Sequence, residues 1–72
     1  MEIAIIAHDW KKVEMVQFLN KNKSILLREK IKIVANEADI NMVIRICDVH
    51  NVPLATNEAT AQLFLLALDE IN

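Results

Sequence analysis

Three short apolar runs divide the chain, and longer segments that mix apolar with charged residues connect them. The runs are residues 2–7 (EIAIIA), 31–35 (IKIVA) and 52–56 (VPLAT). Their length and β-branched content predict three strands, of which the first has the composition of a strand buried on both faces of a parallel sheet. Lys32 and Pro53 favour the sheet edges for the other two strands, where a charge and a missing N–H are tolerated.

The mixed segments predict helices over residues 10–22, 37–50 and 59–71, with one short further turn at residues 25–27. The apolar residues of the middle helix cover more than a narrow stripe, so we expect more than one neighbouring element to cover it. The expected capping residues are Asp9, Ser24, Asn36 and either Thr56 or Asn57, with Asn51 ending the middle helix.

The element order βαβαβα predicts a single α/β domain over residues 1–72, with a small three-stranded parallel sheet and right-handed crossover helices. Strand order 2-1-3 is favoured because it places the fully apolar first strand in the centre. The alternative order 1-2-3 would bury Lys32 in the middle of the sheet.

A chain of 72 residues that is 54% hydrophobic is too small to bury all of its apolar surface internally. A partner surface is therefore expected. The last helix offers one, because Leu63, Phe64 and Leu66 belong to an apolar set that runs nearly all round its axis. We predict a homodimer or higher oligomer with these three residues in the interface.

Charge and length argue against other partner classes. The net charge of −2, with scattered lysines, offers no basic stripe for nucleic acid. The longest apolar run, residues 63–68, is far shorter than the about 20 residues of a membrane-spanning helix, and no signal segment is visible, which predicts a soluble cytoplasmic protein. Cys47 and His50 share a helical face, but two ligands make a weak metal site, so no metal and no cofactor are predicted.

Polar residues follow the predicted strands at their carboxyl ends, where open parallel sheets bind ligands. His8, Asp9 and Lys12 follow the first strand, and Thr56 and Asn57 follow the third. A histidine can exchange a proton or donate to an anion, and helix N-termini bind phosphate. The alternative is structural: the aspartate caps a helix, the histidine ends a strand, and the lysine is solvated.

Two segments, IAIIAHDWKKVEMVQFL and VIRICDVHNVPLATNEATAQLFL, resemble the two ends of the methylglyoxal synthase family. That family opens with a strand ending in Ala-His-Asp and a lysine three residues past the aspartate. It closes with an arginine-bearing helix followed by Asn-Ile/Val-Pro-Leu/Val-Ala-Thr-Asn-x-Ala-Thr-Ala. The resemblance covers residues 1–27 and 43–66. It implies a lyase that removes phosphate from dihydroxyacetone phosphate through an enediolate, without a metal or organic cofactor.

On this resemblance, His8 would contact the substrate, Lys12 would contact its phosphate, and Asp9 would belong to the same motif, while Thr56 and Asn57 would line the mouth of the site. The middle of the family's chain is missing here. The missing parts include the Thr-Gly-rich phosphate loop, the Gly-Asp-Gln-Gln segment that carries the catalytic base, and a later histidine segment. Where phosphate would approach, this sequence has Glu37 and Asp39 instead.

We therefore predict a catalytically incomplete, shortened scaffold of this family, natural or redesigned, that self-associates and is not an enzyme. One alternative is residual methylglyoxal synthase activity, with Asp9 or Glu37 as a replacement base. Another is a module that binds phosphate or dihydroxyacetone phosphate weakly without turnover.

Overall fold

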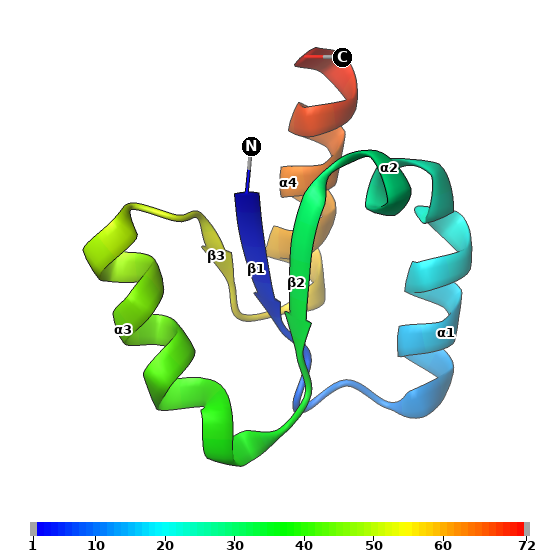
Figure 1. The fold of residues 1–72 in the computed structure, drawn as a ribbon. Coiled ribbons are helices and arrows are strands. Elements are labelled where there is room, and N and C mark those ends of the chain that lie inside the picture. The colour runs from blue at the N-terminus through cyan, green and yellow to red at the C-terminus, as the bar shows by residue number, and fades with distance from the viewer. Residues whose placement is uncertain (1, 72) are drawn as a thin grey trace.

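The computed structural model describes residues 2–71. The three strands form a parallel sheet of order β2-β1-β3 with β1 in the centre (Figure 1). The predicted α/β class, the parallel sheet and the strand order 2-1-3 are confirmed. In chain order the elements are β1 (Glu2–Ile6), α1 (Lys12–Lys21), α2 (Lys23–Arg28), β2 (Lys30–Val34), the 3₁₀ helix η1 (Glu37–Asp39), α3 (Ile40–His50), β3 (Leu54–Ala55) and α4 (Glu58–Ile71).

The two edge strands pair with β1 to different extents. β2 pairs along the whole of β1, from Glu2 opposite Lys30 to Ile6 opposite Val34. β3 pairs only through Leu54 and Ala55, which is shorter than the predicted strand over residues 52–56.

The backbone before β3 explains its short length. The Val52 N–H donates to the Cys47 carbonyl oxygen at 2.9 Å and so still belongs to the end of α3. Pro53 has no N–H to donate, and its carbonyl oxygen accepts from the Ala4 N–H at 3.0 Å. The strand can therefore begin only after the proline.

Helices cover the two faces of the sheet unequally. The helices α1, α2 and α4 cover one face, and α3 alone covers the other (Figure 1). The larger core cluster lies on the three-helix face and the smaller one lies under α3. The larger comprises Ile3, Ile5, Phe18, Ile25, Ala55, Ala61, Leu65 and Leu68, and the smaller comprises Ala4, Val34, Val43 and Cys47.

The first helix starts later than predicted, and Asp9 does not cap it. α1 begins at Lys12, and the Lys11 N–H donates to the Glu14 carboxylate oxygen Oε1 at 2.9 Å. Asp9 lies in a turn that is closed by the Trp10 N–H donating to the Ala7 carbonyl oxygen at 3.1 Å. The side chain of Glu14, three residues into the helix, therefore satisfies the backbone donor that the aspartate was expected to serve.

Two other expected caps are present and one is not. Asn57 Oδ1 accepts from the Thr60 N–H at 2.9 Å, and Asn36 Oδ1 accepts from the Ala38 N–H at 3.0 Å, so Asn36 caps η1. Ser24 lies inside α2, whose capping position is Asn22.

The end of α3 adopts a backbone conformation that glycine usually supplies. Asn51 follows the helix with φ of 56°, in the left-handed region, in a chain that contains no glycine. Asparagine is the next most suitable residue at this position. The expectation that several neighbours cover α3 is wrong, because Ile46 and Val49 are 48% and 72% exposed. No helix within residues 2–71 is long and apolar enough to cross a membrane.

Candidate functional site

The carboxyl ends of the three parallel strands lie at one edge of the sheet, which we call the carboxyl edge (Figure 1). The turn at residues 7–10 follows β1, Ala35 and Asn36 follow β2, and Thr56 and Asn57 follow β3. The strand topology thus brings the predicted site residues from the two ends of the sequence to the same edge.

His8 and Asp9 form a contact pair at the end of the central strand. The distance from His8 Nε2 to Asp9 Oδ1 is 3.1 Å, and the two side chains are 31% and 92% exposed. The preceding backbone is held in place, because the Ala7 N–H donates to the Val34 carbonyl oxygen at 2.8 Å. The contact with this carboxylate limits the orientation of the imidazole ring.

The other predicted residues add hydrogen-bond donors at the same edge. Lys12 is exposed in the first turn of α1, where backbone N–H groups lack partners within the helix. Asn36 and Asn57 use their side-chain oxygens as capping acceptors, which leaves their amide NH₂ groups as donors. Thr56 is exposed. Each of these groups can donate to an anion.

Acidic side chains stand beside β2 at the same edge. Glu37 and Asp39 are exposed in η1, directly after Asn36. Asp39 also lines a hollow of about 420 Å³ next to Asn36 and Lys32 on the α3 side of the sheet. These two carboxylates repel an anion that approaches over β2, so the approach is more favourable on the α1 side of the edge.

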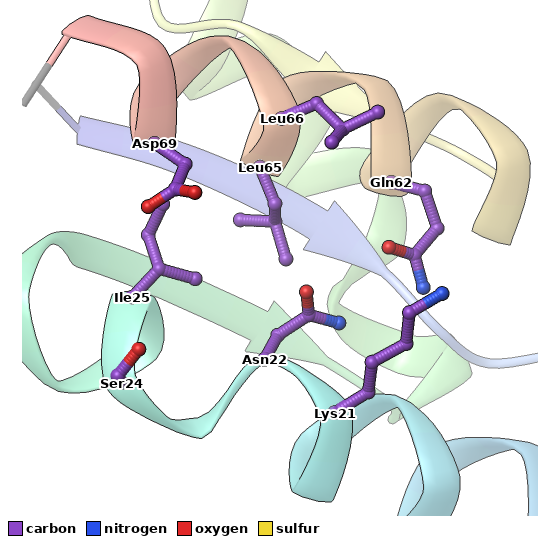
Figure 2. A pocket seen from close by; sticks show the side chains of 8 residues that line it. All are labelled: Lys21, Asn22, Ser24, Ile25, Gln62, Leu65, Leu66 and Asp69. Atoms are coloured by element: carbon purple, nitrogen blue, oxygen red, sulfur yellow. The ribbon is translucent and has the colours of Figure 1, made fainter.

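The hollow drawn in Figure 2 lies away from the carboxyl edge. It measures about 240 Å³ and lies between α4 and the junction of α1 and α2 (Figure 2). Five hollows on the described surface, this one included, are lined by residues other than His8, Asp9 and Lys12. Asp9, Lys12, Thr56 and Asn57 are exposed, so the candidate site residues lie on an open edge.

Trp10, next to the His-Asp pair, is a residue that the sequence pattern did not single out. Its indole ring packs edge-on against Phe18, with ring centroids 5.0 Å apart and an interplanar angle of 76°. The indole Nε1–H is buried and has no hydrogen-bond partner among the described residues. The sequence does contain a signal for Trp10, because a large aromatic residue stands directly after the polar His8-Asp9 motif. The ring anchors the turn that carries His8 to the core.

The buried cysteine does not form a metal site with its neighbour on α3. Cys47 is 5% exposed, whereas His50 is exposed. Burial raises the pKa of the Cys47 thiol, the charges of Asp48 and Glu2 raise it further, and Lys32 lowers it. A metal ligand needs the thiolate, which this environment disfavours. Within residues 2–71, no three His, Cys, Asp or Glu side chains are grouped so that they could hold a metal ion.

The fold and its edge define a small parallel α/β domain that presents a His-Asp pair where ligands bind in such sheets. No family profile matches the chain, and no solved structure matches it. Methylglyoxal synthase of Moorella thermoacetica is 31% identical in an alignment of 116 positions that covers 90% of this chain and 91% of that relative. The chain belongs to the methylglyoxal synthase family.

Two further relatives differ in coverage. Methylglyoxal synthase of Caldicellulosiruptor saccharolyticus is 53% identical over 45 residues, which are 62% of this chain but 32% of that relative. Methylglyoxal synthase of Bacillus subtilis is 28% identical over 121 positions, covering 97% of this chain and 88% of the relative. In the first of these matches the chain spans about a third of the relative's length.

The chain is a shortened member of the family. The alignment with the Moorella relative extends over 116 positions, whereas this chain has 72 residues. Because that alignment already includes most of both proteins, this chain lacks positions inside the aligned region. The prediction of a shortened protein is confirmed.

The prediction that the chain is not an enzyme is wrong. It rested on the missing phosphate loop and base segment, but the relatives are named methylglyoxal synthase and their family is catalytic. The absence of particular segments from this chain does not outweigh its similarity to these relatives.

Proposed function

We propose that the carboxyl edge binds dihydroxyacetone phosphate and releases phosphate from it at a low rate, as a reduced methylglyoxal synthase. One observation carries the proposal: the His8–Asp9 pair ends the central strand of a chain that belongs to this family. The low rate reflects a catalytic set that is incomplete within this short chain.

The reaction makes three chemical demands. A base removes a proton from the hydroxyl-bearing carbon next to the carbonyl group, which gives an enediolate. The bond between carbon and the phosphate oxygen then breaks, phosphate leaves with the bonding electrons, and the remaining enol rearranges to methylglyoxal. The site must therefore hold the phosphate, stabilise the enediolate oxygen and accept a proton.

The described side chains meet two of these demands directly. Lys12 and the free N–H groups at the start of α1 can hold the phosphate. His8, oriented by Asp9, can donate to the substrate oxygen on which negative charge develops. The proton acceptor is Asp9 or Glu37, both of them exposed.

Two features keep the rate low. An exposed carboxylate is not held against the substrate carbon, so the entropy cost of orienting it remains. The open edge also leaves the reacting atoms in contact with water, where each electrostatic interaction contributes less than in a dry site. Glu37 and Asp39 add repulsion toward the phosphate.

The test follows labelled protein and dihydroxyacetone phosphate by NMR in one tube, with phosphate measured in parallel. We expect amide shifts at residues 8–12 and slow formation of methylglyoxal, both strongly reduced in His8→Ala and Lys12→Ala. Lys30→Ala is the matched control, because this exposed lysine is the first residue of β2 and so lies at the amino ends of the strands, away from the carboxyl edge.

The other outcomes are informative. Saturable shifts without product would replace the lyase by a phosphate-binding module. An equal rate in His8→Ala, Lys12→Ala and the control would locate the activity elsewhere or in a contaminant. If the amides and the substrate both stay unchanged, the proposal fails.

Self-association is a second proposal, and a specific observation favours it. Leu63 and Leu66 are 66% and 61% exposed on the outer side of α4. Burying both against a second copy removes apolar surface from water, which stabilises an oligomer. Light scattering at high micromolar concentration should show a mass above that of the monomer.

A further inference from the structure

One side of α4 carries a continuous row of residues with no covering element. Ala59, Leu63, Leu66 and Glu70 follow each other at spacings of four, three and four, which places them on one side of the helix. We call this row the outer face, and all four residues are exposed. The opposite side of α4, with Ala61, Leu65 and Leu68, is buried in the larger core cluster.

Phe64 does not belong to the outer face. It is half-buried and packs against the larger core cluster, although the sequence analysis placed it in an interface with its two neighbours. In Figure 2, Leu65 points from α4 toward α2, and Leu66 lies on the outer side of the helix. The two exposed leucines are therefore the apolar centre of the outer face.

The charged residues of α4 are all acidic. The helix carries Glu58 at its start and Asp69 and Glu70 near its end, with no lysine or arginine. Asp69 is paired with Arg28 at 3.0 Å. Glu70 is exposed, and its side chain has neither a hydrogen bond nor an ion pair within residues 2–71.

A lysine lies beside the first half of α4. Lys21, at the end of α1, lines one hollow together with Glu58, Ala59 and Gln62. It also lines the hollow of Figure 2, where its side chain extends toward Gln62. Like Glu70, Lys21 is exposed, and its side chain has no ion pair or hydrogen bond in the described part of the chain. The basic group and the acidic group thus flank opposite ends of the outer face.

We propose that a second copy of this chain covers the outer face, with the two α4 helices antiparallel about a two-fold axis. The proposal rests on the self-association proposed above and specifies its geometry. Leu63 of each copy then lies opposite Leu66 of the other, and Ala59 lies opposite Glu70, because both pairs are symmetric about the same point of the helix. The small alanine leaves room for the longer glutamate.

The charges select this orientation. The two-fold axis passes between the two α4 helices, perpendicular to the plane that contains them, so α1 lies on the same side of this plane in both copies. Glu70 of one copy therefore comes beside Lys21 of the other, twice per dimer. Antiparallel α4 helices also bring opposite ends of their dipoles together. A parallel arrangement would instead place the two Glu70 carboxylates against each other and would bring neither of them to Lys21.

Charge reversal tests the geometry while sparing the apolar centre. Lys21→Glu and Glu70→Lys should each weaken the dimer about tenfold or more in sedimentation equilibrium at low salt. The double variant, Lys21→Glu with Glu70→Lys, should recover most of the affinity. An equimolar mixture of the two single variants should form a heterodimer. Lys32→Glu is the matched control, because this exposed lysine lies on β2 beneath the α3 side of the sheet, and its dimer affinity should stay unchanged.

The outcomes separate this inference from the proposal on which it rests. A wild-type chain that stays monomeric at high micromolar concentration overturns both. A dimer that Leu63→Glu dissociates, but that the charge reversals leave as stable as the control, retains self-association through α4 and overturns the antiparallel pairing. Circular dichroism of each variant shows whether it is folded. Both reversed residues are exposed, so we expect no loss of helix.

Discussion

The two faces of the sheet differ in the number of helices that cover them and in the size of the core cluster beneath. On the three-helix face, Ile3 and Ile5 of β1 contact a cluster that includes Phe18 and Leu65. On the other face, β1 presents Ala4 to α3. By the same alternation Ile6, which is 7% exposed, points to the face of Ala4, so the difference between the faces lies mainly in the helices that cover them.

The difference indicates where the stability of this small domain lies. A domain of this length has a free energy of unfolding of only about 4–10 kcal/mol. The larger core cluster, which includes Phe18, lies on the three-helix face, and the smaller cluster lies under α3. The α3 face contributes less, and losses there should be tolerated better.

The largest expected effect is the contrast between one core substitution on each face. Phe18→Ala removes a side chain that is 1% exposed and should lower the free energy of unfolding by about 3–5 kcal/mol, enough to unfold much of the protein. Val43→Ala, under α3, removes two methyl groups and should cost only about 1–2 kcal/mol. Urea unfolding at a fixed protein concentration measures both, and equal losses would show that the two faces contribute alike.

A smaller effect is expected from the two asparagine caps. Asn57→Ala removes the acceptor of the Thr60 N–H at the start of α4 and should cost about 1 kcal/mol. Asn36→Ala removes the same kind of bond from η1, a single turn before α3, and should cost less than about 0.5 kcal/mol. The urea midpoints of the two variants should therefore differ, and the reverse order would argue that α3 is held more firmly than its exposure indicates.

The smallest effect concerns the pH dependence of the α3 face. Burial raises the pKa of the Cys47 thiol above its ordinary value of 9.0, so the folded protein holds this proton more tightly than the unfolded chain. The resulting stability is fully present below pH 9 and is lost as the pH rises through the higher pKa of the folded state. Between pH 8 and pH 10, wild-type protein should lose more stability than Cys47→Ala in urea unfolding. Parallel losses would mean that the thiol ionises equally in both states.

Much of the sheet could be predicted because single residues restrict it strongly. Lys32 and Pro53 identified the edge strands, and the uninterrupted apolar β1 identified the centre. The start of α1 could not be predicted from capping preference alone. Asp9 contacts His8 at 3.1 Å, and the Glu14 side chain accepts the Lys11 N–H at the start of the helix instead. Capping preferences describe single residues and do not include such competition between neighbours.

The sequence predicts where the candidate site lies on the sheet, but not how its side chains contact one another. The rule that parallel strands share a carboxyl edge is enough to place His8, Lys12 and Asn57 at one edge of the sheet. The contact between His8 and Asp9 and the buried indole of Trp10 depend on side-chain packing in the turn after β1. No periodicity in the sequence encodes that packing.

The central place of β1 also has a consequence for biosynthesis. The ribosome makes β1 before the other described elements, yet one of its two hydrogen-bonded neighbours, β3, and the last helix of its core, α4, come last among them. While residues 35–71 are being added, Ile3 and Ile5 lack Leu65 and Leu68 as packing partners. During this interval the apolar side chains of β1 lack part of their native cover, which makes this strand a segment that chaperones can bind.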